Sequence, residues 1–161
     1  MVKVSLQTLS KRELIALILA LQKEGDLSSQ ALTTFIEKAT KVSVPSFIFT
    51  KDLGALESIC KYLKENQGLT YHQIAQLLDR NDRTIWTTYH NACKKREQLF
   101  VPEKSVFFIP ISLIKKRTLS VLETIVVHLK EEYEFTYHTI AELLQRNERT
   151  IWTVYQRAKK K

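Results

Sequence analysis

Glycine, proline and cysteine are scarce in this sequence of 161 residues, which contains three glycines, three prolines and two cysteines. So few turn-forming residues argue against an all-β design and fit short turns between helices. The cysteines, Cys60 and Cys93, have neither metal-ligand nor redox spacing, and Cys60 falls among the apolar positions of a predicted helix, so we expect it in a core. Because no second ligand recurs near the four histidines, we expect no metal site and no cofactor.

Long hydrophobic runs are absent too. The richest apolar stretch, Leu14 to Leu21, is flanked by charge and falls well short of the roughly 20 residues that cross a bilayer. No small-residue cleavage pattern follows it, so we expect no secretory signal, no membrane partner and a cytoplasmic location. The sequence also contains no glycine-rich phosphate loop, no metal-binding set of carboxylates and no nucleophile beside a base. We therefore expect that the protein is not an enzyme.

Acidic residues are fewer than basic residues. Lysine and arginine number 25 against 17 aspartates and glutamates, which gives a net charge of +8, while 44% of residues are hydrophobic as in globular proteins. A basic surplus of this size favours a polyanionic partner, either nucleic acid or an anionic membrane surface. Without a long apolar segment, nucleic acid is the better expectation.

An internal repeat organises the chain. Residues 53–95 and 119–161 align without a gap at a constant offset of 66, and 25 of the 43 aligned positions are identical. A weaker similarity upstream relates Val-Pro-Ser-Phe-Ile at 44–48 to Ile-Pro-Ile-Ser-Leu-Ile at 109–114. We therefore expect an all-α protein with a first domain at 44–96, a linker at 97–108 that is too apolar to float freely, and a second domain at 109–161.

Each repeat has the pattern of three helices. In the first, the predicted helices run from about Leu53 to Asn66, from the N-cap Thr70 with Gln73 completing a capping box, and from the N-cap Asn81. The predicted buried positions of the first repeat are Leu53, Leu56, Ile59, Cys60, Leu63, Ile74, Ala75, Leu77, Leu78, Ile85, Tyr89 and Ala92. In the second repeat the predicted N-caps are Thr136 and Asn147, and the predicted buried positions are Ile140, Ala141, Leu143, Leu144, Ile151, Tyr155 and Ala158.

Residues 1–43 form a separate N-terminal region. A capping box at Ser10–Glu13 and Gly25 at a C′ position predict a helix over 11–24, and a second helix is expected over about 29–40. The first of these helices is apolar around more than half of its circumference and must be covered. Two covering surfaces are open. One is a second copy of the chain, which would make a homodimer, and the other is formed by Phe35, Ile36 and the apolar linker of the same chain.

The second and third helices of each repeat carry a motif. A small residue, Ala75, lies between apolar positions that can fix the crossing of two helices, and the motif reads Ile74-Ala75-Gln-Leu-Leu78-Asp-Arg-Asn81-Asp-Arg-Thr84-Ile85. This segment, with its copy in the second repeat, resembles the helix-turn-helix of sigma-factor region four and of LuxR-type response regulators, whose pattern is I-A-x-x-L-x-x-S-x-x-T-V. The turn glycine common in that family is Asp79 in one copy and Gln145 in the other, and Asp enters the left-handed region more easily than Gln.

The resemblance implies that the third helix of each repeat lies in the major groove of DNA. An arginine there can reach guanine with two hydrogen bonds, and a threonine methyl can touch thymine. The expected DNA-binding residues are Arg83, Thr84, Trp86, Thr87, His90, Arg149, Thr150, Trp152, Thr153 and Gln156. The expected phosphate contacts are Tyr71, His72, Asn81, Lys94, Lys95, Tyr137, His138, Asn147 and Lys160. For the two tryptophans, packing against the core is an equally open alternative, and the two arginines could be solvated surface.

These observations predict a protein that binds double-stranded DNA in a sequence-specific way, as a prokaryotic-type transcription regulator associated with the nucleoid. An architectural protein that bridges DNA, or a DNA-recruitment adaptor of a recombination or plasmid-maintenance system, stays open as an alternative. The target sequence, the direction of regulation, any effector ligand, the oligomeric state and the relative orientation of the two units do not follow from the sequence.

Overall fold

A computed structural model describes residues 42–101, 107–115 and 117–161 of the chain. The described part is mostly helical, as predicted, with one small antiparallel sheet of two strands. None of its helices is long and apolar enough to cross a membrane. The two predicted N-terminal helices and the proposed dimer contact of residues 1–41 lie outside the described residues.

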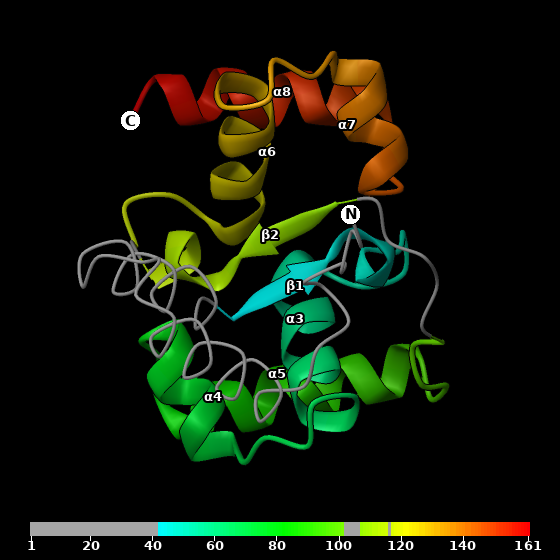
Figure 1. Ribbon diagram of the computed structural model, residues 1–161, viewed down its shortest axis with the longest axis vertical. Coiled ribbons are helices and arrows are strands. Elements are labelled where there is room, and N and C mark those ends of the chain that lie inside the picture. Colours follow the sequence, from blue (N-terminus) through cyan, green and yellow to red (C-terminus); the bar gives the residue numbers. More distant parts are fainter. Residues whose placement is uncertain (1–41, 102–106, 116) are drawn as a thin grey trace, which may run out of the picture. The chain divides into compact units, whose positions relative to one another are not determined.

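Two successive groups of elements reflect the sequence repeat (Figure 1). The first group consists of β1 (Ser43–Pro45), the 3₁₀ helix η2 (Ser46–Ile48), α3 (Ala55–Glu65), α4 (Tyr71–Leu78) and α5 (Asp82–Lys95). The second group consists of β2 (Phe108–Pro110), the 3₁₀ helix η3 (Ile111–Lys115), α6 (Val121–Glu131), α7 (Tyr137–Leu143) and α8 (Glu148–Lys159).

The helix ends follow the predicted caps. The Thr70 hydroxyl accepts a hydrogen bond from the backbone N–H of Gln73, whose side chain accepts from the backbone N–H of Thr70, so the capping box is formed. The side chains of Asn81 and Asn147 cap α5 and α8 by accepting from backbone N–H groups two residues on. The capping box satisfies two of the orphan N–H groups at the start of α4, whereas the Asn side chain satisfies one at the start of α5 and one at the start of α8.

The turn between the second and third helix of each repeat uses a left-handed residue. Asp79 has φ 51° and Gln145 has φ 49°, at equivalent positions 66 residues apart. A third left-handed residue, Glu134 with φ 54°, occupies the position that Gly68, with φ 67°, holds in the first repeat. Because L-residues with side chains adopt this conformation at a cost, the second repeat carries backbone strain that the first avoids at Gly68.

The two repeats share one core. Val42–Lys161 form a single compact unit, and the buried cluster includes Ile59 and Ile85 of the first repeat together with Ile125 and Ile151 of the second. The segment predicted as a linker takes part in this packing. Phe100 is buried, and β2 begins at Phe108, within the predicted linker.

The pairing of strand β1 with strand β2 relates the two repeats by a local twofold axis. In the antiparallel pair β1–β2, Val44 lies opposite Ile109, both fully buried, and each of them precedes the proline of its own strand. The flanking pairs, Ser43 with Pro110 and Pro45 with Phe108, exchange under that twofold. Sequence alone left the relative orientation of the repeats open, whereas the strand register relates them by a pseudo-dyad at this point.

Arginines tie each repeat to the other. Arg146, in the turn before α8, donates to the carbonyl oxygens of Lys51 (3.2 Å) and Leu53 in the first repeat. Arg117, just before α6, donates to the carbonyl oxygen of Asp79 in the turn before α5. The turn before α8 is therefore attached to the first repeat through its own Arg146, and the turn before α5 is attached to the second repeat through Arg117.

Candidate nucleic-acid interface

The first turns of α5 and α8 are exposed and carry the same side chains. Arg83, Thr84 and Thr87 are exposed on α5, and Arg149, Thr150 and Thr153 are their exposed equivalents on α8. The residue between them, Ile85 or Ile151, is fully buried, which fixes the face of each helix that points to solvent. The sequence-predicted set is thus brought together on one side of each helix.

Trp86 and Trp152 are only partly covered by the core. Their exposed fractions are 50% and 51%, so about half of the surface of each residue is open to solvent. The ring of Trp86 stacks on His90 with a centroid distance of 3.9 Å, and His90 Nδ1 lies 2.8 Å from the Trp86 carbonyl oxygen. His90 is half-buried, and its ring is oriented by Trp86 of the same helix.

Both threonines of the second turn have fixed rotamers. The hydroxyl of Thr87 donates to the carbonyl oxygen of Arg83 at 2.9 Å, and Thr153 donates to that of Arg149 at 2.8 Å. Because the hydroxyl proton is used within the helix, each side chain offers an external partner its methyl group and the lone pairs of its oxygen.

The predicted phosphate contacts on α4 and α7 differ in accessibility. Tyr71 is half-buried against Tyr89, with Lys64 Nζ 4.8 Å from its ring centroid, and Tyr137 repeats this arrangement with Tyr155 and Lys130. Burial raises the pKa of the Tyr71 phenol, which therefore stays neutral and can donate to an anion.

The two histidines of these helices are exposed. His72 Nδ1 lies 3.1 Å from a carboxylate oxygen of Asp82, and His138 Nδ1 lies 3.5 Å from Glu148. Each histidine therefore lies beside the first turn of the helix that follows it, close to the Asn cap.

The lysines at the ends of α5 and α8 separate into two kinds. Lys95 Nζ pairs with Glu57 at 2.8 Å, and Lys161, its equivalent, pairs with Glu123 at 2.8 Å. The hydrogen bond from Lys161 holds the pKa of Glu123 below its ordinary value. Lys94 and Lys160 are exposed and have no ion pair among the described residues, so they are the available cations of the predicted set.

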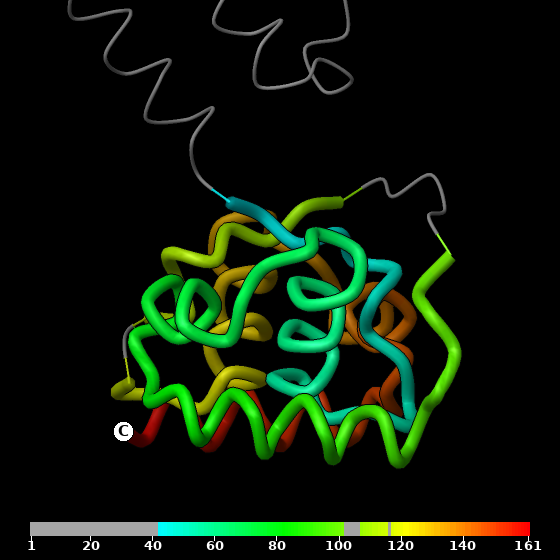
Figure 2. Tube along the Cα trace, turned by 90° about the horizontal axis from the view of Figure 1, so that it is seen from below, coloured from blue at the N-terminus to red at the C-terminus, as the bar shows by residue number. Residues whose placement is uncertain are grey.

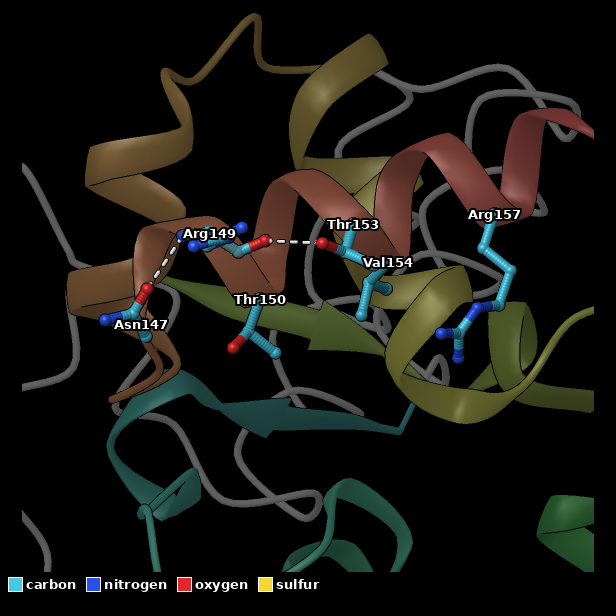
Figure 3. A pocket seen from close by; sticks show the side chains of 6 residues that line it. All are labelled: Asn147, Arg149, Thr150, Thr153, Val154 and Arg157. Atoms are coloured by element: carbon cyan, nitrogen blue, oxygen red, sulfur yellow. Dashed lines mark hydrogen bonds between the residues drawn. The ribbon is translucent and has the colours of Figure 1, made fainter.

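A shallow groove of about 520 Å³ runs along α8 (Figure 3). It is lined by Asn147, Arg149, Thr150, Thr153, Val154 and Arg157. Sequence reasoning missed Arg157, which is exposed and has no ion-pair partner in the described part of the chain. Its equivalent in the first repeat is Asn91, so the identity between the two copies gave no signal for it.

Both helices lie on one face of the described unit. Figure 2 shows α5 and α8 along the same edge, with β1 and β2 at the opposite edge. In Figure 1 the two helices run in opposite directions, as the twofold between the repeats requires. The two helices that carry the equivalent exposed arginine, threonine and tryptophan residues therefore lie along the same edge of the described unit.

Comparison of the chain with protein-family models, curated proteins and solved structures found no match.

Proposed function

We propose that the protein binds double-stranded DNA in a sequence-specific way and regulates transcription, with α4–α5 and α7–α8 acting as two helix-turn-helix units. The observation that carries the proposal is the repeated exposed set on α5 and α8. Packing requires Ile85 and Ile151, but packing gives no reason for identical arginine, threonine and tryptophan side chains on the solvent side of both helices.

The chemistry of this set suits a duplex. A guanidinium such as that of Arg83 or Arg149 can donate two hydrogen bonds to guanine O6 and N7, and the Thr87 methyl can contact the methyl of thymine. The free N–H groups at the starts of α5 and α8, together with Lys94, suit phosphates, because helix N-termini and lysines both favour anions.

Arginine substitutions test the proposal. Arg83→Ala and Arg149→Ala are each expected to weaken binding by about 1–3 kcal/mol and to relax the preference at one base pair. Lys115→Ala, which removes a charge outside both helices, serves as the matched control and is expected to change affinity far less. Fluorescence anisotropy with a labelled duplex from a random-sequence selection measures these effects at one fixed salt concentration.

Salt dependence and sequence discrimination refine the test. Lys94→Ala is expected to weaken all duplexes alike and to lower the salt slope by about one ion, as for a phosphate contact. A folded Arg83→Ala/Arg149→Ala variant with unchanged affinity would contradict the proposal. Tight binding with no preference among sequences would instead favour an architectural, DNA-bridging role.

A further inference from the structure

The relation between α5 and α8 predicts the symmetry of the DNA target, on the premise that the proposed function holds. The strand register makes the repeats equivalent about the Val44–Ile109 pair, and the two helices run in opposite directions on one face (Figures 1 and 2). Recognition elements related by a twofold meet half-sites of opposite orientation, since duplex DNA has twofold axes perpendicular to its own axis.

The repeats cannot turn freely to meet a direct repeat. Val44 and Ile109 are fully buried between them, and Arg146 and Arg117 hold the turns before α8 and α5 to the other repeat. Reorienting one unit would break the sheet and expose the shared core. The distance between the two DNA-facing helices is therefore fixed by packing rather than by the length of a linker.

The two helices are equivalent only over their first turns. Beyond Thr87 and Thr153, α5 has Thr88, His90 and Asn91 where α8 has Val154, Gln156 and Arg157. His90 is engaged with Trp86, whereas no hydrogen bond of the Gln156 side chain is found within the described residues. Glutamine can make two hydrogen bonds to adenine, and Arg157 adds a cation that the first repeat lacks.

We infer that the protein's preferred ligand is an imperfect inverted repeat in duplex DNA, with two half-sites that share the bases read by Arg83 and Arg149 and differ where Gln156 and Arg157 replace His90 and Asn91. The half-site under α8 is the more firmly held, because Arg157 supplies an extra phosphate or base contact there. A monomer of this chain therefore reads both halves of such a site.

Selection from random duplex DNA with the full chain tests this inference. The wild type is expected to enrich an inverted repeat with unequal halves at one spacing, and changing that spacing by half a helical turn is expected to lower affinity about 100-fold, through loss of the second, intramolecular contact. The variant Val154→Thr/Gln156→His/Arg157→Asn copies the first repeat onto α8 and is expected to enrich a more symmetric repeat. Circular dichroism verifies that this surface variant is folded.

The outcomes separate the inference from the proposed function. Enrichment of a direct repeat, of a single half-site or of no motif by a protein that still binds duplex DNA would overturn the inference and leave DNA binding standing. An unchanged motif with the folded triple variant would overturn the assignment of the asymmetry to α8. Failure to bind any duplex at low salt would overturn both.

Discussion

The buried ammonium group of Lys61 offers a sharp test of how this fold is stabilised. Lys61 is fully buried on α3, and its Nζ pairs with Glu65 Oε1 at 2.8 Å, where the Glu65 side chain is 14% exposed. Its other neighbour is the sulfur of Cys93 at 4.0 Å, a weak acceptor. Removing the carboxylate leaves a buried charge with almost no compensation.

Glu65→Leu is expected to lower the free energy of unfolding by about 3 kcal/mol, the low end of the cost of breaking a buried pair, because Glu65 itself reaches solvent. The second repeat provides a matched control. Glu131, its equivalent, pairs at 2.6 Å with Lys159, whose side chain is 55% exposed. Glu131→Leu leaves that ammonium group in water, so a much smaller loss is expected.

A swap tests the same reasoning by rescue. In the second repeat, Val127 stands at the position of Lys61, and Lys159 stands at the position of Cys93. Glu65 therefore pairs with a lysine of its own helix, whereas Glu131 of α6 pairs with a lysine of α8. Lys61→Val alone is expected to destabilise the protein, and Lys61→Val with Cys93→Lys is expected to recover most of the loss.

Urea unfolding followed by far-ultraviolet circular dichroism measures these differences, with equal m-values as the condition for comparison. Equal losses for Glu65→Leu and Glu131→Leu would refute the argument that burial of the ammonium group sets the cost. Failure of the swap to recover stability would show that the two networks are not interchangeable.

Glu134→Gly and Gln145→Gly are each expected to raise the free energy of unfolding by about 0.5–1 kcal/mol, because glycine adopts the left-handed conformation without strain, and Gly68→Ala is expected to lower it. Thermal unfolding measures all three variants. Lower stability of both glycine variants would contradict the strain argument. Burial lowers the pKa of His128 below its ordinary value of 6.5, so its contribution to stability is present above about pH 6.5 and is lost as the pH falls further. His128→Tyr, which installs the residue of the first repeat, should therefore reduce the difference in unfolding free energy between about pH 7.5 and pH 5.5, and an unchanged difference would exclude His128 as its source. Burial raises the pKa of Cys60 to about 12, so iodoacetamide at about pH 8 is expected to leave this thiol unmodified until urea unfolds the chain, as mass spectrometry of the digest can report.

Much of the helical structure could be predicted from the sequence, because helix caps and apolar helix faces depend on residues that are close together in the chain. The capping box at Thr70 and the Asn caps at Asn81 and Asn147 act through hydrogen bonds between neighbours in the chain, and the structure places each where the pattern predicted it. The apolar spacing likewise identified most buried positions of the helices, and Ile85 and Ala92 are fully buried, whereas Leu56, Leu77, Leu143 and Tyr155, also predicted as core, are only partly buried. Tyr89, predicted as core, is half-buried because its hydroxyl reaches Glu65.

The sequence pattern did not predict contacts between segments that lie far apart in the chain. The two-stranded sheet joins residues 65 positions apart, and nothing local to Val44 or Ile109 states that they face each other. Lys95 looked like a free cation at a helix end, yet Glu57, 38 residues away, takes up its charge.

The repeat in the sequence determined that two similar three-helix groups would form, because each group carries its own caps and apolar face. Their antiparallel relation was decided by the tertiary structure alone. Burying Val44 against Ile109, with Arg146 donating across the boundary, fixes one orientation among those that the same repeats could adopt, and the position of α5 relative to α8 follows from that burial.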